Sequence, residues 1–223
     1  MEIQFLGHSC FRIKGRDAIL LTDPYSPQIG LKLGGPTADI VTVSHQHFDH
    51  NEISQVTGTQ KRPQPFIISG PGEYEVAGVF IYGLPSFHDR ANGAKRGENT
   101  IYVINMDGLR VAHLGDLGHR LSEEQVEEIN GVDVLLVPVG GSDCNLDANQ
   151  AVEVIGQIEP KIVIPMHYQF PGSKLELAPL EDFLKAIGVE LKPIDKLVVD
   201  QGKLPEERTV VVLNARSKNS SSS

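Results

Sequence analysis

His45-Gln46-His47-Phe48-Asp49-His50 decides the fold, because it places four side chains that can bind a metal within six residues. It follows directly on Asp39–Ser44, a β-branched run typical of a buried strand. In an extended segment, side chains at i and i+2 point to the same side, so His45 and His47 can converge on one ion. Asp49 and His50, past the bend, can turn toward a second ion. Imidazole and carboxylate suit Zn²⁺, Mn²⁺ or Fe²⁺, and the absence of Cys from this stretch argues against a closed structural zinc site.

Ligands from one short stretch cannot complete a catalytic metal site, which needs distant ligands and an open position for water. Three later residues with suitable side chains, His88, Asp116 and His167, lie where the chain leaves a predicted strand. His113, three residues before Asp116, competes with His88 as the remaining histidine ligand. The residues alone leave that choice open.

The rest of the chain predicts sheet layers covered by helices, because strands dominate the first half and strands alternate with helices in the second. The three predicted helices are one that begins at Ser122, where Ser122 and Gln125 fit a capping box, then Asp147–Ile158 behind an Asp cap, and Pro179–Ile187. The predicted strands are Ile3–Leu6, Cys10–Ile13, Ala18–Leu21, Asp39–Ser44, Phe66–Ser69, Val79–Leu84, Thr100–Asn105, Leu109–Leu114, Val132–Val137, Lys161–Pro165 and Thr209–Leu213.

Composition excludes several classes of protein. Of 223 residues, 40% are hydrophobic, which is enough for a packed core and too many for a disordered chain. We expect a single domain over residues 1–214 and a disordered, serine-rich tail over 215–223. The net charge of −9 disfavours nucleic-acid partners.

Targeting signals are also lacking in the sequence. No apolar run approaches the roughly 18 residues of a membrane span, and no signal peptide begins the chain. Two Cys are too few for a disulfide framework. We therefore expect a cytoplasmic protein that is not bound to a membrane and that is compatible with a homo-oligomer.

Several motifs together resemble the metallo-β-lactamase superfamily. The first is the stretch at 45–50, and the others are Gly115-Asp116, Pro165-Met166-His167-Tyr168, Leu6-Gly7-His8-Ser9-Cys10-Phe11 and Thr22-Asp23-Pro24. Within that superfamily the sequence is similar to the small hydrolases that resemble ascorbate-6-phosphate lactonases, over residues 3 to 213. The resemblance implies an α/β protein with a four-layer αββα sandwich.

The resemblance also implies a site for two divalent metal ions, with Zn favoured over Mn or Fe. One ion would be held by His45, His47 and His88, the other by Asp49, His50 and His167, and Asp116 would bridge them. It favours His88 over His113 as the ligand, and His113 would then orient Asp116 or another ligand.

The implied activity is hydrolysis by a metal-activated water. Asp49 and Asp116 would be the catalytic residues that orient this water, and the substrate would be a lactone, ester or phosphoester, with a phosphorylated sugar lactone as the specific suggestion. Two alternatives are a phosphodiesterase or nuclease of the same fold and a metal-binding protein without catalysis. A di-iron redox role is disfavoured, because such relatives carry Glu where this chain has His47 and are fused to a flavin domain.

A few residues near these motifs are candidates for support or substrate binding. Arg90, Lys95 and Arg96 form a local basic cluster after His88 that could steer a small anionic or phosphorylated substrate. His8 either caps a turn or approaches the metals or the substrate. The segment 140–145 is a candidate for the rim of the site, and His119 is expected at the surface.

Overall fold

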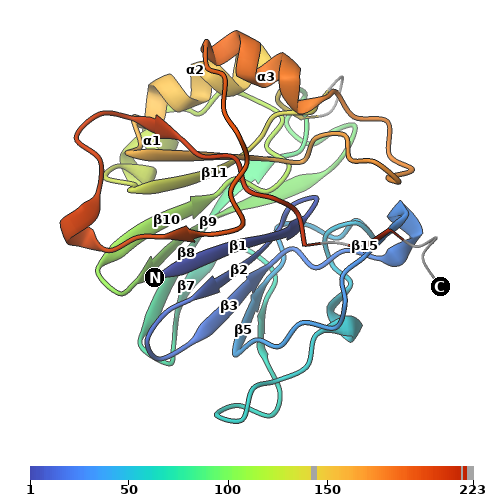
Figure 1. The fold of residues 1–223 in the computed structure, drawn as a ribbon, viewed down its shortest axis with the longest axis vertical. Coiled ribbons are helices and arrows are strands. Elements are labelled where there is room, and N and C mark those ends of the chain that lie inside the picture. The colour runs from blue at the N-terminus through green and yellow to red at the C-terminus, as the bar shows by residue number, and fades with distance from the viewer. Residues whose placement is uncertain (142–144, 217, 220–223) are drawn as a thin grey trace.

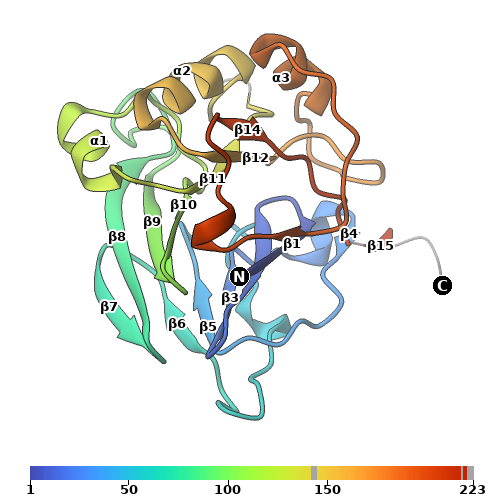
Figure 2. The same cartoon turned by 60° about the vertical axis from the view of Figure 1, so that its left-hand side comes forward.

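Two mixed β-sheets stacked face to face form the body of the molecule (Figures 1 and 2). The structure is a computed structural model that describes residues 1–141, 145–216 and 218–219. In both views the three α-helices lie together beyond the second sheet, on the side away from the first.

The first sheet has the strand order β13-β1-β2-β3-β5-β6. β1, β3, β5 and β6 run in one direction, whereas β2 and β13 run in the opposite direction. Its strands are β13 (Leu197–Val198), β1 (Glu2–Gly7), β2 (Cys10–Lys14), β3 (Ile19–Thr22), β5 (Ile40–Thr42) and β6 (Phe66–Ile68).

The second sheet has the strand order β14-β12-β11-β10-β9-β8-β7. β14, β12, β11, β10 and β8 share one direction, and β9 and β7 oppose them. Its strands are β14 (Thr209–Val210), β12 (Ile162–Met166), β11 (Val134–Pro138), β10 (Leu109–His113), β9 (Glu98–Met106), β8 (Val79–Phe87) and β7 (Gly72–Val76).

Alternation along the strands divides the apolar side chains of the first sheet between its two faces. Phe5 and Phe11 stack with ring centroids 4.7 Å apart in the core shared with the second sheet. Leu21 faces the other way, into a smaller cluster with Ile29 and Leu31. The short elements that contribute to this cluster are η1 (Pro27–Ile29) and β4 (Leu31–Lys32). A third, η2 (Ile53–Gln55), directly precedes Val56, which also belongs to the cluster. Turns and 3₁₀ helices, rather than α-helices, therefore form the outer layer on that side within the described residues.

The helices begin where their caps predict. α1 (Glu123–Ile129) and α2 (Ala148–Ile158) both start behind capping boxes, which pair Ser122 with Gln125 and Asp147 with Gln150. α3 (Leu180–Ile187) ends at Gly188, whose φ of 80° is the left-handed conformation that closes many helices. α2 buries one apolar face and packs against β11 and α3. The predicted αββα layering is thus confirmed on the side of the second sheet.

Short elements at the edges of the sheets escaped prediction. β7 buries only Val76 among its five residues, so it has no apolar run to mark it. β15 (Lys218–Asn219) pairs with β4 inside the tail expected to be disordered, and Arg216 donates a backbone hydrogen bond to Phe5. The rest of that expectation falls on residues 217 and 220–223, which lie outside the described residues. No helix in the described part of the chain is long and apolar enough to cross a membrane.

Candidate metal centre

The candidate metal ligands stand just past the carboxyl ends of strands from both sheets. These strands run in a common direction within each sheet, and this end of a sheet is where ligand sites form in α/β proteins. The residues and the strands that they follow are His8 after β1, residues 45–50 after β5, His88 after β8, Asp116 after β10 and His167 after β12.

Asp116 lies at the middle of the cluster and is 2% exposed. Its Oδ2 is 3.1 Å from Nε2 of both His88 and His167, 3.3 Å from Nε2 of His50 and 3.9 Å from Nε2 of His45. A single carboxylate oxygen therefore faces histidines from both halves of the sequence-predicted site, as a bridging ligand must.

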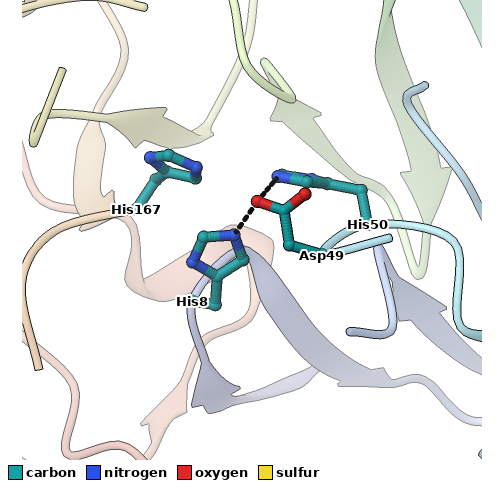
Figure 3. A group of neighbouring side chains, drawn as sticks. All are labelled: His8, Asp49, His50 and His167. Carbon is teal, nitrogen blue, oxygen red and sulfur yellow. Dashed lines mark hydrogen bonds and ion pairs between the residues drawn. The ribbon is translucent and has the colours of Figure 1, made fainter. Parts of the chain in front are cut away.

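Around Asp116 the potential ligand atoms fall into groups whose members lie within 4.8 Å of one another. One group is His45, His47 and His88, and another is Asp49, His50, His167 and His8. Figure 3 shows His8 between His167 on one side and Asp49 and His50 on the other. The division matches the sequence prediction, with His8 added to the second group.

Four buried polar atoms in this cluster have no hydrogen-bond partner. They are Nε2 of His45, His50 and His167 and Oδ1 of Asp116. Leaving a buried acceptor unpaired costs about 1–3 kcal/mol, so four of them at one place indicate a missing common partner. Imidazole nitrogens and a carboxylate oxygen are good ligands for Zn²⁺, Mn²⁺ and Fe²⁺, so the residues fit a divalent ion.

Asp23 holds two of these histidines in the tautomer that binds metal. His50 donates from Nδ1 to Asp23 Oδ2 over 2.8 Å. Ser44 donates from Oγ to the same oxygen over 2.6 Å, which leaves Oγ to accept from Nδ1 of His45 at 2.9 Å. With the proton on Nδ1, the lone pair of each ring is on Nε2 and faces the cluster. Asp23 is 0% exposed, and the sequence marked it only as part of the motif Thr22-Asp23-Pro24, without a role.

Two asparagines that the sequence did not single out also support the cluster. The side-chain amide nitrogen of Asn145 lies 2.8 Å from Nδ1 of His167. An ion on Nε2 of His167 requires the ring proton on Nδ1, so the amide would then turn to accept that proton through its oxygen. Asn99 accepts the backbone N–H of Asp116 at 3.0 Å and donates to Leu114. Asn145 is the last residue of the predicted rim segment, whose residues 142–144 lie outside the described residues.

Electrostatics keep the carboxylates of the cluster ionised. Burial raises the pKa of Asp116, but the adjacent rings of His167 and His50 favour its charged form, outweigh the effect of burial and leave that pKa well below its usual value. Burial opposes ionisation of Asp49 too, yet His50 and His8 lower its pKa. Burial lowers the pKa of His45 to about 2, so its ring is neutral and available as a ligand.

The structure brings His88, and not His113, into the cluster. His113 is fully buried, donates from Nε2 to the carbonyl oxygen of Ser9 at 2.9 Å and accepts the N–H of Gly115 at 3.2 Å. It therefore holds the turn that presents Asp116. His119, which was expected at the surface, is half-buried and accepts the N–H of Phe87 at 3.2 Å, next to His88.

A cavity of about 300 Å³ opens beside the cluster and includes His47, His88, Asp116 and His167 in its lining. The remaining walls come from Phe48, Asp49 and Asn145, from Leu175, Glu176 and Leu177, and from Arg96.

Of the predicted basic cluster, only Arg96 lines this cavity. Arg90 lies 3.9 Å from Asp147, and Lys95 is exposed. The carboxylate of Asp89 fixes the loop that carries all three, because it accepts backbone N–H groups from four residues, including those of Lys95 and Arg96.

Comparison with known proteins agrees with this geometry. A family model described as a β-lactamase superfamily domain matches residues 2–167. A UPF0173 metal-dependent hydrolase of Pyrococcus abyssi is 30% identical over 88% of this chain and 99% of its own length. Another, from Carboxydothermus hydrogenoformans, is 28% identical over 87% of this chain and 97% of its own length.

A solved structure from Thermotoga maritima, provisionally assigned as a zinc-dependent hydrolase of the metallo-β-lactamase superfamily, is similar over the whole fold. It is 38% identical, covers 95% of this chain and 97% of its own, and has a TM-score of 0.77. None of these three descriptions names a lactonase, and that finer resemblance stays a prediction. The chain belongs to the metallo-β-lactamase superfamily and, within it, to the family of UPF0173 metal-dependent hydrolases.

Proposed function

We propose that the protein hydrolyses small anionic esters, lactones or phosphoesters at a centre for two divalent ions, with Zn²⁺ as the favoured metal. The convergence of four unpartnered buried ligand atoms around Asp116 carries the proposal of the metal centre. His45, His47 and His88 would hold one ion and Asp49, His50 and His167 the other, with Asp116 between them. Such ions supply a water whose pKa falls from about 15.7 toward about 7 and a charge that polarises the substrate oxygen.

The protein's own side chains would orient the attacking water and handle its proton. Asp116 and Asp49 are ionised and border the same cavity, so each can accept a hydrogen bond from a water there. Among the described residues that line the cavity the other acid is Glu176, which is not part of the groups of potential metal ligands that include Asp49 and Asp116. We therefore assign proton transfer to Asp49 or Asp116 rather than to Glu176.

Recognition of an anionic group is assigned to Arg96. It is the one Arg or Lys side chain among the described residues that line the cavity. Phe48, Leu175 and Leu177 line the same space, so the substrate meets an apolar wall together with one positive charge. A cavity of about 300 Å³ suits a small molecule, which favours a metabolite-sized substrate over a nucleic acid.

Alanine variants of two adjacent basic residues, Arg96 and Lys95, test this proposal. Both residues are exposed, but Arg96→Ala removes a cation that lines the cavity, whereas Lys95→Ala removes the same charge from a neighbour outside that lining. Both variants keep the backbone hydrogen bond to Asp89. A charge-assisted hydrogen bond of about 1.5–3 kcal/mol predicts that Arg96→Ala lowers kcat/KM about 10- to 100-fold on anionic substrates.

The assays use the Zn²⁺-loaded protein. The compounds tested are nitrophenyl phosphodiesters, nitrophenyl esters and simple lactones, each with and without a carboxylate or phosphate group. Lys95→Ala should behave as the unaltered protein, and neutral substrates should not distinguish the two variants. Equal losses in both variants would refute the role of Arg96. Failure of the loaded protein to turn over any of these compounds would support the alternative, a metal-binding protein without catalysis.

A further inference from the structure

His8 and His167 join the two sheets at the metal centre. Each follows a strand end, β1 in the first sheet and β12 in the second, and each has a positive φ, 57° and 53°. Left-handed backbone is costly for a residue with a side chain and persists where the surroundings enforce it. The N–H of His167 donates to the carbonyl oxygen of His8 over 2.8 Å, and their ring centroids are 4.3 Å apart.

The ring of His8 is aimed at Asp49. Its Nε2 lies 3.1 Å from Asp49 Oδ2, and the ring is 2% exposed, as the dashed line in Figure 3 shows for this contact. Within the described residues, this is the one hydrogen bond that the side chain of Asp49 accepts. Asp49 lies on the turn after β5 with its side chain 13% exposed. The other close polar contact of its Oδ2 is Nε2 of His50, at the longer distance of 3.6 Å.

His8 differs from the histidines proposed as ligands. Nε2 of His45, His50 and His167 makes no hydrogen bond and faces the shared carboxylate of Asp116, whereas Nε2 of His8 is hydrogen-bonded to Asp49. A carboxylate has about four lone-pair sites, so Asp49 can accept from His8 and still bind an ion. We propose that His8 is a positioning residue that donates its Nε2 hydrogen to Asp49 and thereby sets the affinity of the second metal site.

This inference rests on the proposed metal centre, but its test measures metal binding and not hydrolysis. The two variants are His8→Gln, whose side-chain amide keeps an N–H donor, and His8→Leu, which keeps bulk without a donor. Both are unbranched at Cβ, so both face the same left-handed backbone at residue 8. Stepwise Zn²⁺ affinities are measured by competition with a chromophoric chelator, together with zinc content per chain.

We expect two ions per chain for the unaltered protein and for His8→Gln. In His8→Leu one ion should bind about 10- to 100-fold more weakly, the usual effect of losing a hydrogen bond to a metal ligand, while the other keeps its affinity. The retained ion also reports that the variant is folded. To assign the affected site, the same change is made in a His88→Gln background, where the weakening should persist, and in a His167→Gln background, where it should disappear.

Two results would overturn the inference. Unchanged Zn²⁺ affinities in His8→Leu would show that Asp49 needs no partner at residue 8. Loss of the second ion in His8→Gln to the same degree as in His8→Leu would show that the imidazole binds the ion itself. Absence of hydrolysis in a chain that binds both ions as expected would count against the proposed substrates and leave the role of His8 intact.

Discussion

Replacing Asp23 with Asn should disable His50 as a metal ligand while hardly changing the shape of the site. Oδ1 would still accept the backbone N–H of Ser44, which it does now over 2.8 Å. The new amide NH₂ would stand where Oδ2 now accepts from Nδ1 of His50. Two donors cannot face each other, so the His50 proton should move to Nε2, and Nδ1 should accept from the amide. Nε2, 3.3 Å from Asp116, would then carry a hydrogen in place of the lone pair that an ion needs.

The magnitude follows from the bond that is lost. A hydrogen bond from a histidine to a buried carboxylate contributes about 1.5–3 kcal/mol, and about 1.4 kcal/mol corresponds to a tenfold change in affinity. The second Zn²⁺ should therefore bind about 10- to 100-fold more weakly. Asp23 also supports His45 through Ser44, so the first ion should weaken by a smaller factor, because that path runs through one further hydrogen bond.

Competition titration with a chromophoric chelator measures both affinities. The matched control is Asp39→Asn. Asp39 is also a buried carboxylate on the first sheet that accepts a backbone N–H, from Ile19, and a hydroxyl, from Thr59, but it has no histidine partner. Asp39→Asn should lower the free energy of unfolding and leave Zn²⁺ affinity unchanged. If Asp23→Asn bound both ions as tightly as the unaltered protein, or if both variants lost affinity equally, the tautomer argument would be refuted.

Three further predictions concern the folded chain as a whole. Gly115→Ala should lower the free energy of unfolding in urea by about 2–5 kcal/mol, because φ is +57° and a Cβ would clash with the side-chain oxygen of Asn99. Gly34→Ala, with positive φ but open space, should cost only about 1–2 kcal/mol, and equal losses would contradict this. Burial raises the pKa of both Tyr102 and Tyr168, so above pH 10 unfolded chains release protons that the folded chain keeps. Each tyrosine should lower stability by about 1.4 kcal/mol per pH unit, and Tyr102→Phe should reduce the alkaline slope by that amount and leave the share of Tyr168. Removing metal with a chelator should lower the melting temperature, because an ion at 1,000 times its Kd stabilises the fold by about 4 kcal/mol; an unchanged melting curve would argue against binding at the buried cluster.

Long apolar strands and capped helices could be read from the sequence because local physics determines them. β9 and β10 are near-continuous buried runs, and the capping boxes at Ser122 and Asp147 specify where two helices begin. β13 has two residues and is partly exposed, so its existence depends on the neighbouring strand and not on its own pattern. Of the strand predicted over Thr209–Leu213, only Thr209–Val210 pairs with β12, as β14. The outer layer of the first sheet is unpredictable for the same reason, since turns around Ile29 bury apolar side chains without any helical period.

The site divides in a similar way between ligands and their supports. The stretch 45–50 can be recognised from the sequence because several potential ligands are adjacent in it. Asp23, Asn99 and Asn145 act on histidines or on Asp116 from other segments. Asp23 belongs to a motif of the resemblance that assigned it no role, and the local sequence of Asn99 and Asn145 gives no sign of theirs. His88 and His113 show the limit most clearly. Both end strands of the second sheet, and only the packing of His113 against Ser9 places its ring away from the cluster.

Neither sheet can build either half of the metal centre alone. In the first group His45 and His47 follow β5, whereas His88 follows β8 in the other sheet. In the second, Asp49 and His50 follow β5, whereas His167 follows β12. Each ion would therefore connect the two sheets, and binding free energy at the site is also free energy of packing between them. The hydrogen bond from His167 to His8 makes the same connection through the backbone, without any ion. The seam between the sheets is thus held close to its final geometry before a metal arrives, which lowers the cost of ordering the ligands and allows an affinity that depends on supports such as Asp23.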